Sequence, residues 1–121
     1  MSSAGPLAGR RVLIVEDEAL VAMLVEDILL DAGAEVVGPR GTAVEALALL
    51  AEATPDAAVV DVNLGDHTSE PVIKALTARG VPFLVATGYG TAGLTVPPGS
   101  AVIAKPFEPS ALICRLAALL S

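Results

Sequence analysis

The sequence is poor in aromatic residues, in cysteine and in positive charge. Phe, Trp and Tyr together make up 2% of the 121 residues, so a core has to be built from Val, Leu, Ile and Ala. The one cysteine, Cys114, cannot form an internal disulfide, which fits a reducing cytoplasm. Lys and Arg number 7 against 14 Asp and Glu, and the net charge of −7 disfavours nonspecific binding to nucleic acid.

Long apolar runs are also missing. No stretch approaches the roughly 18 residues that a membrane span needs, and the first residues lack the basic and apolar regions of a secretory signal. We therefore expect a cytoplasmic protein without membrane contact. Hydrophobic residues still make up 54%, enough for one folded domain over 10–121 after a flexible segment over 1–9. Cys114 is expected in the core of that domain.

Short β-branched runs alternate with helical patterns, which is typical of a parallel sheet covered on both faces. Strands are predicted at Arg11–Val15, Glu35–Gly38, Ala57–Val62, Pro82–Thr87 and Ala101–Ala104. Helices are predicted at Ala19–Asp31, from Thr42, at Ser69–Arg79 and from Pro109 to about Leu120. This order indicates an α/β flavodoxin-like doubly wound fold with sheet order 2-1-3-4-5. A fourth helix in chain order belongs within Gly88–Gly99, where four glycines and two prolines make it weak.

Apolar stripes predict which face each helix buries. The first helix, closed by Gly33, has an apolar stripe of Val21, Leu24, Val25, Ile28 and Leu29. The second has capping-box spacing at Thr42 and Glu45. Its expected buried face consists of Val44, Leu47, Ala48 and Ala51. The apolar surface of the last helix is compatible with a homodimer and consists of Ile113, Leu116, Ala117 and Leu120.

Polar residues stand where the predicted strands end. These residues are Glu16, Asp17, Glu18, Asp61, Thr87 and Lys105. Because the carboxyl ends of parallel strands meet at one edge, they are expected to converge at the ligand-binding rim of the fold. Two carboxylates about 5 Å apart repel by roughly 3 kcal/mol at an effective dielectric constant of 20, so such a cluster needs a cation.

An all-oxygen site of this kind suits Mg²⁺. The cation would shield Asp61 during attack on a phosphoryl group, while Thr87 and Lys105 hold phosphoryl oxygens. Each residue also has a plainer interpretation. The acidic run fits a solvated helix start, Asp61 a helix-entry residue and Lys105 an ordinary loop lysine. His67 is read as a solvated loop residue.

Four motifs lie in order along the chain. They are LIVEDE at Leu13–Glu18, VVDVNLGD at Val59–Asp66, ATGY at Ala86–Tyr89 and AKPF at Ala104–Phe107. With them the chain resembles response-regulator receiver domains of two-component systems over Arg10–Leu120. The resemblance implies a signalling switch phosphorylated by a sensor histidine kinase or a histidine phosphotransfer protein, not an enzyme acting on other substrates.

The resemblance also implies a role for each matching residue. Asp61 would be the phosphoacceptor, and Glu16 with Asp17 the acidic pair that serves Mg²⁺ together with it. Asn63 would offer its backbone carbonyl to the metal. Thr87 would be the switch hydroxyl and Lys105 the lysine that contacts the phosphoryl group.

Pro82–Gly90 resembles a subgroup, often single-domain, that is named for a Phe-Ala-Thr-Gly-hydrophobic-Tyr (FATGUY) motif. Here Val85 stands in place of the motif's Phe. Val102 stands where many receivers carry an aromatic switch residue, and Tyr89 is the candidate to replace it. The subgroup is associated with sensor kinases of the HWE/HisKA2 kind, which are the expected partners.

Three other classes stay open at this point. An aspartyl-nucleophile phosphatase would use Asp61, but no second carboxylate stands two residues later. A flavodoxin needs a phosphate-binding loop after the first strand, where Glu16–Glu18 would repel phosphate. A phosphate-independent interaction module is the third alternative. Turnover of a phosphate ester or flavin absorbance would distinguish the first two from a receiver.

Overall fold

The computed structural model describes residues 5–61, 63–64, 67–87, 101–104 and 108–120. The strands are β1 (Arg11–Val15), β2 (Glu35–Arg40), β3 (Ala57–Asp61), β4 (Asn63–Leu64), β5 (His67–Thr68), β6 (Phe83–Thr87) and β7 (Ala101–Ala104). The helices are α1 (Ala19–Asp31), α2 (Ala43–Glu52), α3 (Glu70–Ala78) and α4 (Pro109–Leu120). The weak helix expected within Gly88–Gly99 lies outside the described residues. Within the described residues, no helix combines the length and the apolar character that a membrane span requires.

The main sheet has five strands in the order β2-β1-β3-β6-β7, and every neighbouring pair is parallel. This order confirms the predicted doubly wound topology. β4 and β5 form a separate antiparallel pair that was not predicted. Each of these strands has 2 residues, too few to show an alternating pattern in the sequence. His67, expected in a loop, belongs to β5.

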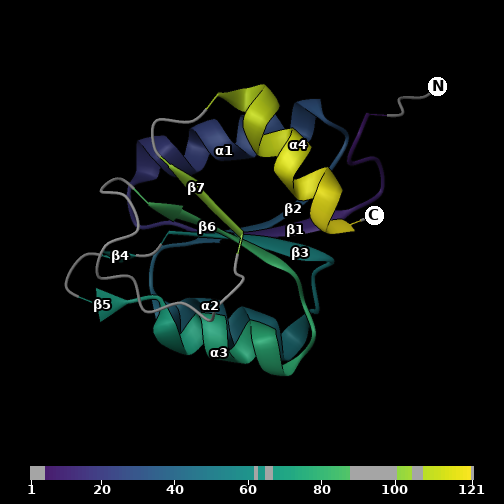
Figure 1. The fold of residues 1–121 in the computed structure, drawn as a ribbon. Coiled ribbons are helices and arrows are strands. Elements are labelled where there is room, and N and C mark those ends of the chain that lie inside the picture. The colour runs from purple at the N-terminus through teal and green to yellow at the C-terminus, as the bar shows by residue number, and fades with distance from the viewer. Residues whose placement is uncertain (1–4, 62, 65–66, 88–100, 105–107, 121) are drawn as a thin grey trace.

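The sheet lies between two helical layers, with α1 and α4 on one face and α2 and α3 on the other (Figure 1). Alternate residues of β1 reach the two cores, as the period of a strand requires. Val12 and Ile14 belong to the cluster that includes α1 and α4. Leu13 and Val15 belong to the cluster that includes α2 and α3. All four side chains are fully buried, which explains the unbroken apolar run of this central strand.

The predicted faces of α1 and α2 need correction. In α1, Leu24 is 52% exposed, and Ala22 is buried in the stripe instead. In α2, Val44 is 77% exposed, and the buried residues are Ala46 and Leu50. Ala48 and Ala51 of the predicted face are exposed as well, and Leu47 is partly buried. Both helices carry apolar residues around most of their circumference, so periodicity alone does not decide which side meets the sheet.

The last helix also differs from expectation. Leu116 is fully buried, and Ile113, Ala117 and Leu120 pack partly buried against the core. The apolar face proposed for a homodimer is therefore the face that covers the sheet. Cys114, expected in the core, is exposed. Ile113 and Leu116, three residues apart, lie on the same side of the helix and face the core. Cys114 lies between them in sequence and therefore faces away from the core.

The packed domain begins ahead of the predicted boundary at residue 10. Leu7 is fully buried in the core on the α1–α4 side of the sheet. Its N–H donates to the Ala32 carbonyl at 2.9 Å, and the Gly9 N–H donates to the Gly33 carbonyl at 3.3 Å. Gly33 has a φ of 91°, the left-handed conformation expected of a residue that closes a helix. The segment before β1 thus packs over the end of α1.

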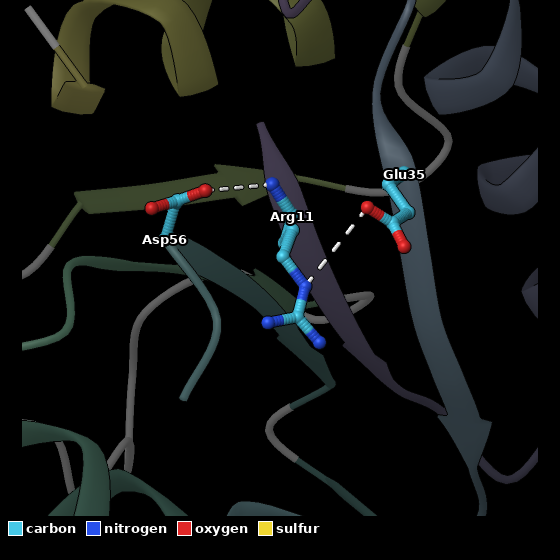
Figure 2. Close-up of polar contacts among 3 residues, drawn as sticks. All are labelled: Arg11, Glu35 and Asp56. Atoms are coloured by element: carbon cyan, nitrogen blue, oxygen red, sulfur yellow. Dashed lines mark hydrogen bonds and ion pairs between the residues drawn. The ribbon is translucent and has the colours of Figure 1, made fainter. Parts of the chain in front are cut away.

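Arg11 joins the starts of three strands at the edge of the sheet opposite the predicted site (Figure 2). Its backbone N–H donates to Oδ2 of Asp56, just before β3, at 2.8 Å. Its Nε lies 4.0 Å from Oε2 of Glu35 at the start of β2. The ion pair is largely exposed and contributes little to stability. The hydrogen bond from a backbone donor to a carboxylate is the stronger of the two contacts.

The predicted cap of α2 is present. Thr42 Oγ1 accepts a hydrogen bond from the Glu45 N–H and donates one to Glu45 Oε1, both at 3.1 Å. Thr42→Ala should therefore lower the free energy of unfolding by about 1 kcal/mol. Thr54→Ala, at an exposed position outside the helices, should change it by less than about 0.5 kcal/mol. Equal losses in urea unfolding of both variants would contradict the cap.

Candidate functional site

The carboxyl ends of β1, β3, β6 and β7 meet at one edge of the sheet. Val15 pairs with Val60, so the residues that follow them, Glu16 and Asp61, leave neighbouring strands side by side. Asp61 pairs with Ala86, which places Thr87 one step further along β6. Thr87 in turn pairs with Ala104, the residue before Lys105. The register thus brings together the strand ends whose polar residues were predicted to converge.

Three carboxylates gather at this edge. Glu16, Asp17 and Asp61 each offer an oxygen atom, and these atoms all lie within 4.8 Å of one another. Glu16 is 7% and Asp61 8% exposed, whereas Asp17 is exposed to solvent. At such a separation two unit charges repel by roughly 3 kcal/mol at an effective dielectric constant of 20. A cation bound among the three would remove this repulsion.

The donor set fits Mg²⁺. Carboxylate oxygens are hard ligands, and Mg²⁺ in proteins takes one or two of them and completes its shell with water and phosphate oxygens. The exposure of Asp17 leaves the cluster open on the solvent side, where such ligands enter. Glu16, Asp17 and Asp61 are the one set of three or more Asp, Glu, His or Cys side chains, among the described residues, that are spaced closely enough to hold a metal ion.

Local hydrogen bonds hold Glu16 in the cluster. Its Oε2 accepts the Glu18 N–H at 3.1 Å, and its own N–H donates to the carbonyl of Arg40 at 2.9 Å. Glu18 is the N-cap of α1, yet its side chain makes no capping bond. The acidic run therefore has two parts. Glu16 turns into the site, and the exposed Glu18 matches the plainer interpretation of a solvated helix start.

The remaining predicted site residues are described to different extents. The Thr87 side chain is 1% exposed at the end of β6. Asn63 is described by its backbone, which pairs with Thr68 in the short β4–β5 ladder. Lys105 and Tyr89 lie outside the described residues. Of the predicted set, the structure thus brings together Glu16, Asp17 and Asp61 by distance, and Thr87 by strand register.

Arg40 contributes to the site in a way that was not predicted from the sequence. β2 was expected to end at Gly38, but the strand continues through Pro39, and the Arg40 carbonyl reaches Glu16. The Gly38–Pro39 pair could have indicated a bulge in an edge strand, because proline within a strand is confined to edges and bulges. β2 is an edge strand, and its register with β1 shifts at this point.

The model of the response regulator receiver domain family matches residues 12–117. This chain belongs to that family. Over 111 residues it is 30% identical to the chemotaxis protein CheY of Thermotoga maritima, with 87% of this chain and 92% of CheY covered. The receiver fold and a place in two-component signalling follow from this membership, and the acidic cluster is of the kind through which receiver domains bind Mg²⁺.

Two solved structures illustrate the likeness of this receiver domain to others. The solution structure of SdrG from Sphingomonas melonis Fr1 is 40% identical, with a TM-score of 0.81 and full coverage of both chains. The response regulator PhyR from Brucella abortus is 30% identical, with a TM-score of 0.85 over 97% of this chain. That match covers 49% of PhyR, so the receiver domain spans about half the length of that relative.

The two positions at which this receiver domain lacks an expected aromatic residue are neighbours in space. Val85, in place of the motif's Phe, pairs with Val102 across the β6–β7 ladder. Val85 is fully buried, and Val102 packs partly buried against the same core cluster as α2 and α3. Two β-branched side chains thus stand side by side, a pairing that suits a sheet.

Proposed function

We propose that this receiver domain is a phosphorylation-dependent switch in which Asp61 accepts a phosphoryl group in the presence of Mg²⁺. The observation that carries the proposal is the convergence of Glu16, Asp17 and Asp61 within 4.8 Å at the carboxyl edge of the sheet. Membership of the receiver family supports it. The chain would catalyse its own phosphorylation and dephosphorylation and act on no other substrate.

The position of Asp61 in the sheet supports a role as the nucleophile. Asp61 closes the buried strand β3, where it pairs with Ala86 of β6, and the residue before it pairs with β1. With Asp17, and with Glu16 assisting through water, Asp61 would hold Mg²⁺, and Asn63 would add its backbone carbonyl. The cation supplies charge neutralisation between the attacking carboxylate and the phosphoryl oxygens. Phosphoryl transfer depends mainly on such positioning and charge stabilisation.

Thr87 and Lys105 would complete the site by contacting the remaining phosphoryl oxygens. Thr87 ends β6, the strand that pairs with β3 at Asp61, and Lys105 follows Ala104 in sequence, which pairs with Thr87 in the β6–β7 ladder. A Thr87 hydroxyl drawn toward the phosphoryl group would shift the conformation of the residues that follow β6, where Tyr89 is the candidate to replace the usual aromatic switch residue. This would couple phosphorylation to a change of shape.

The phosphoryl donor would be a sensor histidine kinase, of the HWE/HisKA2 kind by the subgroup resemblance, or a histidine phosphotransfer protein. We infer that the exchange takes place in the cytoplasm, in keeping with the single unpaired cysteine. With a net charge of −7, the downstream partner is expected to be a protein rather than nucleic acid.

The proposal predicts a separation between phosphorylation and its response. Thr87→Ala should still accept a phosphoryl group from acetyl phosphate and Mg²⁺, because Asp61 and the metal ligands are intact. Its amide chemical-shift changes on phosphorylation should be reduced to a small fraction of the wild-type changes. Thr87→Ser keeps the hydroxyl and should restore them. A complete wild-type NMR response in Thr87→Ala would contradict the switch role.

A further inference from the structure

β2 carries a bulge directly beside the acidic cluster. In its ladder with β1, Leu13 pairs with Val37 and Val15 pairs with Arg40. Ile14 therefore stands opposite two residues, Gly38 and Pro39, rather than one. A bulge of this kind bends its strand and redirects the residues that follow. Here those residues are Arg40 and the start of the loop to α2.

The redirected segment supports the backbone of the metal site. The Arg40 carbonyl accepts the Glu16 N–H at 2.9 Å. The next residue, Gly41, is close enough that a Cβ built on it would lie 3.5 Å from the Asp17 Cα and 3.7 Å from the Glu16 carbonyl oxygen. Arg40 thus bonds to Glu16, and the neighbouring Gly41 lies close to Asp17, the next acidic residue after β1.

The bulge depends on glycine at position 38. Gly38 has a φ of 95°, which side chains of L-residues rarely adopt. A Cβ built there would lie 3.1 Å from the Arg40 nitrogen and 3.2 Å from the Ile14 carbonyl oxygen. Both atoms belong to the backbone and cannot move aside as a flexible side chain does. Room for a Cβ has to come from small shifts of the Arg40 backbone and of the Ile14 carbonyl, the two sides of the bulge beside Glu16.

We propose that Gly38 is a positioning residue for the Mg²⁺ site, acting through the Arg40 carbonyl on Glu16 and Asp17. Gly38 is not one of the residues that would hold the metal, and the atoms nearest to a Cβ built on it belong to Arg40, Ile14 and Leu13. Because Mg²⁺ demands near-ideal octahedral geometry, a small displacement of its ligands weakens binding. This inference rests on the proposed function, since it assumes that the cluster binds Mg²⁺.

The test is a Mg²⁺ titration of the metal-free protein, followed by NMR of the backbone amides because the chain has no tryptophan to report binding by fluorescence. Gly38→Ala should raise the dissociation constant for Mg²⁺ by about 10-fold, the lower end of the effect of removing an outer-shell support. The Glu16 amide should also exchange faster with solvent, relative to Val12, because its bond to Arg40 is disturbed.

Gly80→Ala is the matched control. Gly80 also has a positive φ, 70°, but a Cβ built there meets nothing within 4 Å, and the residue follows α3 at the opposite edge of the sheet from the site. Both variants lose stability through backbone strain. Only Gly38→Ala should lose Mg²⁺ affinity. If it does not fold, Gly38→Asn takes its place, because Asn tolerates positive φ yet still adds the Cβ.

Wild-type Mg²⁺ affinity in a folded Gly38 variant, or equal losses in the Gly38 and Gly80 variants, would overturn the inference and leave the proposed function standing. A wild-type protein that binds no Mg²⁺ would instead overturn the proposed function, and the inference with it. The exchange rate of the Glu16 amide tests the Arg40 contact by itself. A Glu16 exchange rate that is unchanged in Gly38→Ala would contradict the path through Arg40.

Discussion

Replacing Asp61 by asparagine should abolish the uptake of a phosphoryl group from acetyl phosphate and Mg²⁺. The amide has nearly the shape of the carboxylate but lacks the negative oxygen that attacks phosphorus. Intact mass spectrometry should show one added phosphoryl group on the wild-type protein and none on Asp61→Asn. Because Asp61 is 8% exposed and closes a buried strand, a circular dichroism spectrum should accompany the measurement.

The control for this loss is Asp27→Asn. Asp27 is an exposed carboxylate on α1, and its replacement removes the same charge away from the site. Asp27→Asn should be labelled to the wild-type extent. Labelling that persists in a folded Asp61→Asn variant would show that another residue is the acceptor.

Replacing Asp17 by alanine should separate metal binding from stability. The variant loses an expected Mg²⁺ ligand, so its affinity should fall by more than about 100-fold, beyond the range for outer-shell partners. In Mg²⁺-free buffer its free energy of unfolding should rise, because a carboxylate within 4.8 Å of Glu16 and Asp61 is removed. The gain should be about 1 kcal/mol rather than 3, since Asp17 is exposed and solvent screens it.

Glu18→Gln is the matched control for Asp17→Ala. It removes an exposed negative charge one residue away, from a side chain that makes no capping bond. Its Mg²⁺ affinity should stay within about twofold of wild type, since an exposed charge outside the ligand set is largely screened. Equal affinities in the wild-type protein and Asp17→Ala would count decisively against the proposed ligand set.

The sheet order and the acidic cluster could both be predicted because the parallel strands can be recognised in the sequence. Strands buried on both faces read as unbroken apolar runs, and their order with the helices restricts the topology. Once the strands are parallel, residues at their carboxyl ends, such as Glu16 and Asp61, must share an edge. The structure bears this out, with Val15 opposite Val60 in the ladder.

The errors arose where the sequence pattern does not select one arrangement. Leu24 and Val44 are exposed because their helices are apolar on several sides, so the sheet rather than the period selects the buried face. Leu7 is a single apolar residue among small ones and carries no periodicity. The Arg40 contact with Glu16 is a backbone contact, made by a bulge that depends on the conformation of Gly38.

Mg²⁺-dependent phosphorylation at the acidic cluster can be tested on the unaltered protein. The wild-type chain is incubated with acetyl phosphate in Mg²⁺ or in excess chelator and weighed by intact mass spectrometry. We expect one added phosphoryl group in Mg²⁺, its loss on brief treatment with base, and far less labelling in chelator. No added group in Mg²⁺, or equal labelling with and without the cation, would show that the cluster is not a Mg²⁺-dependent phosphoacceptor site.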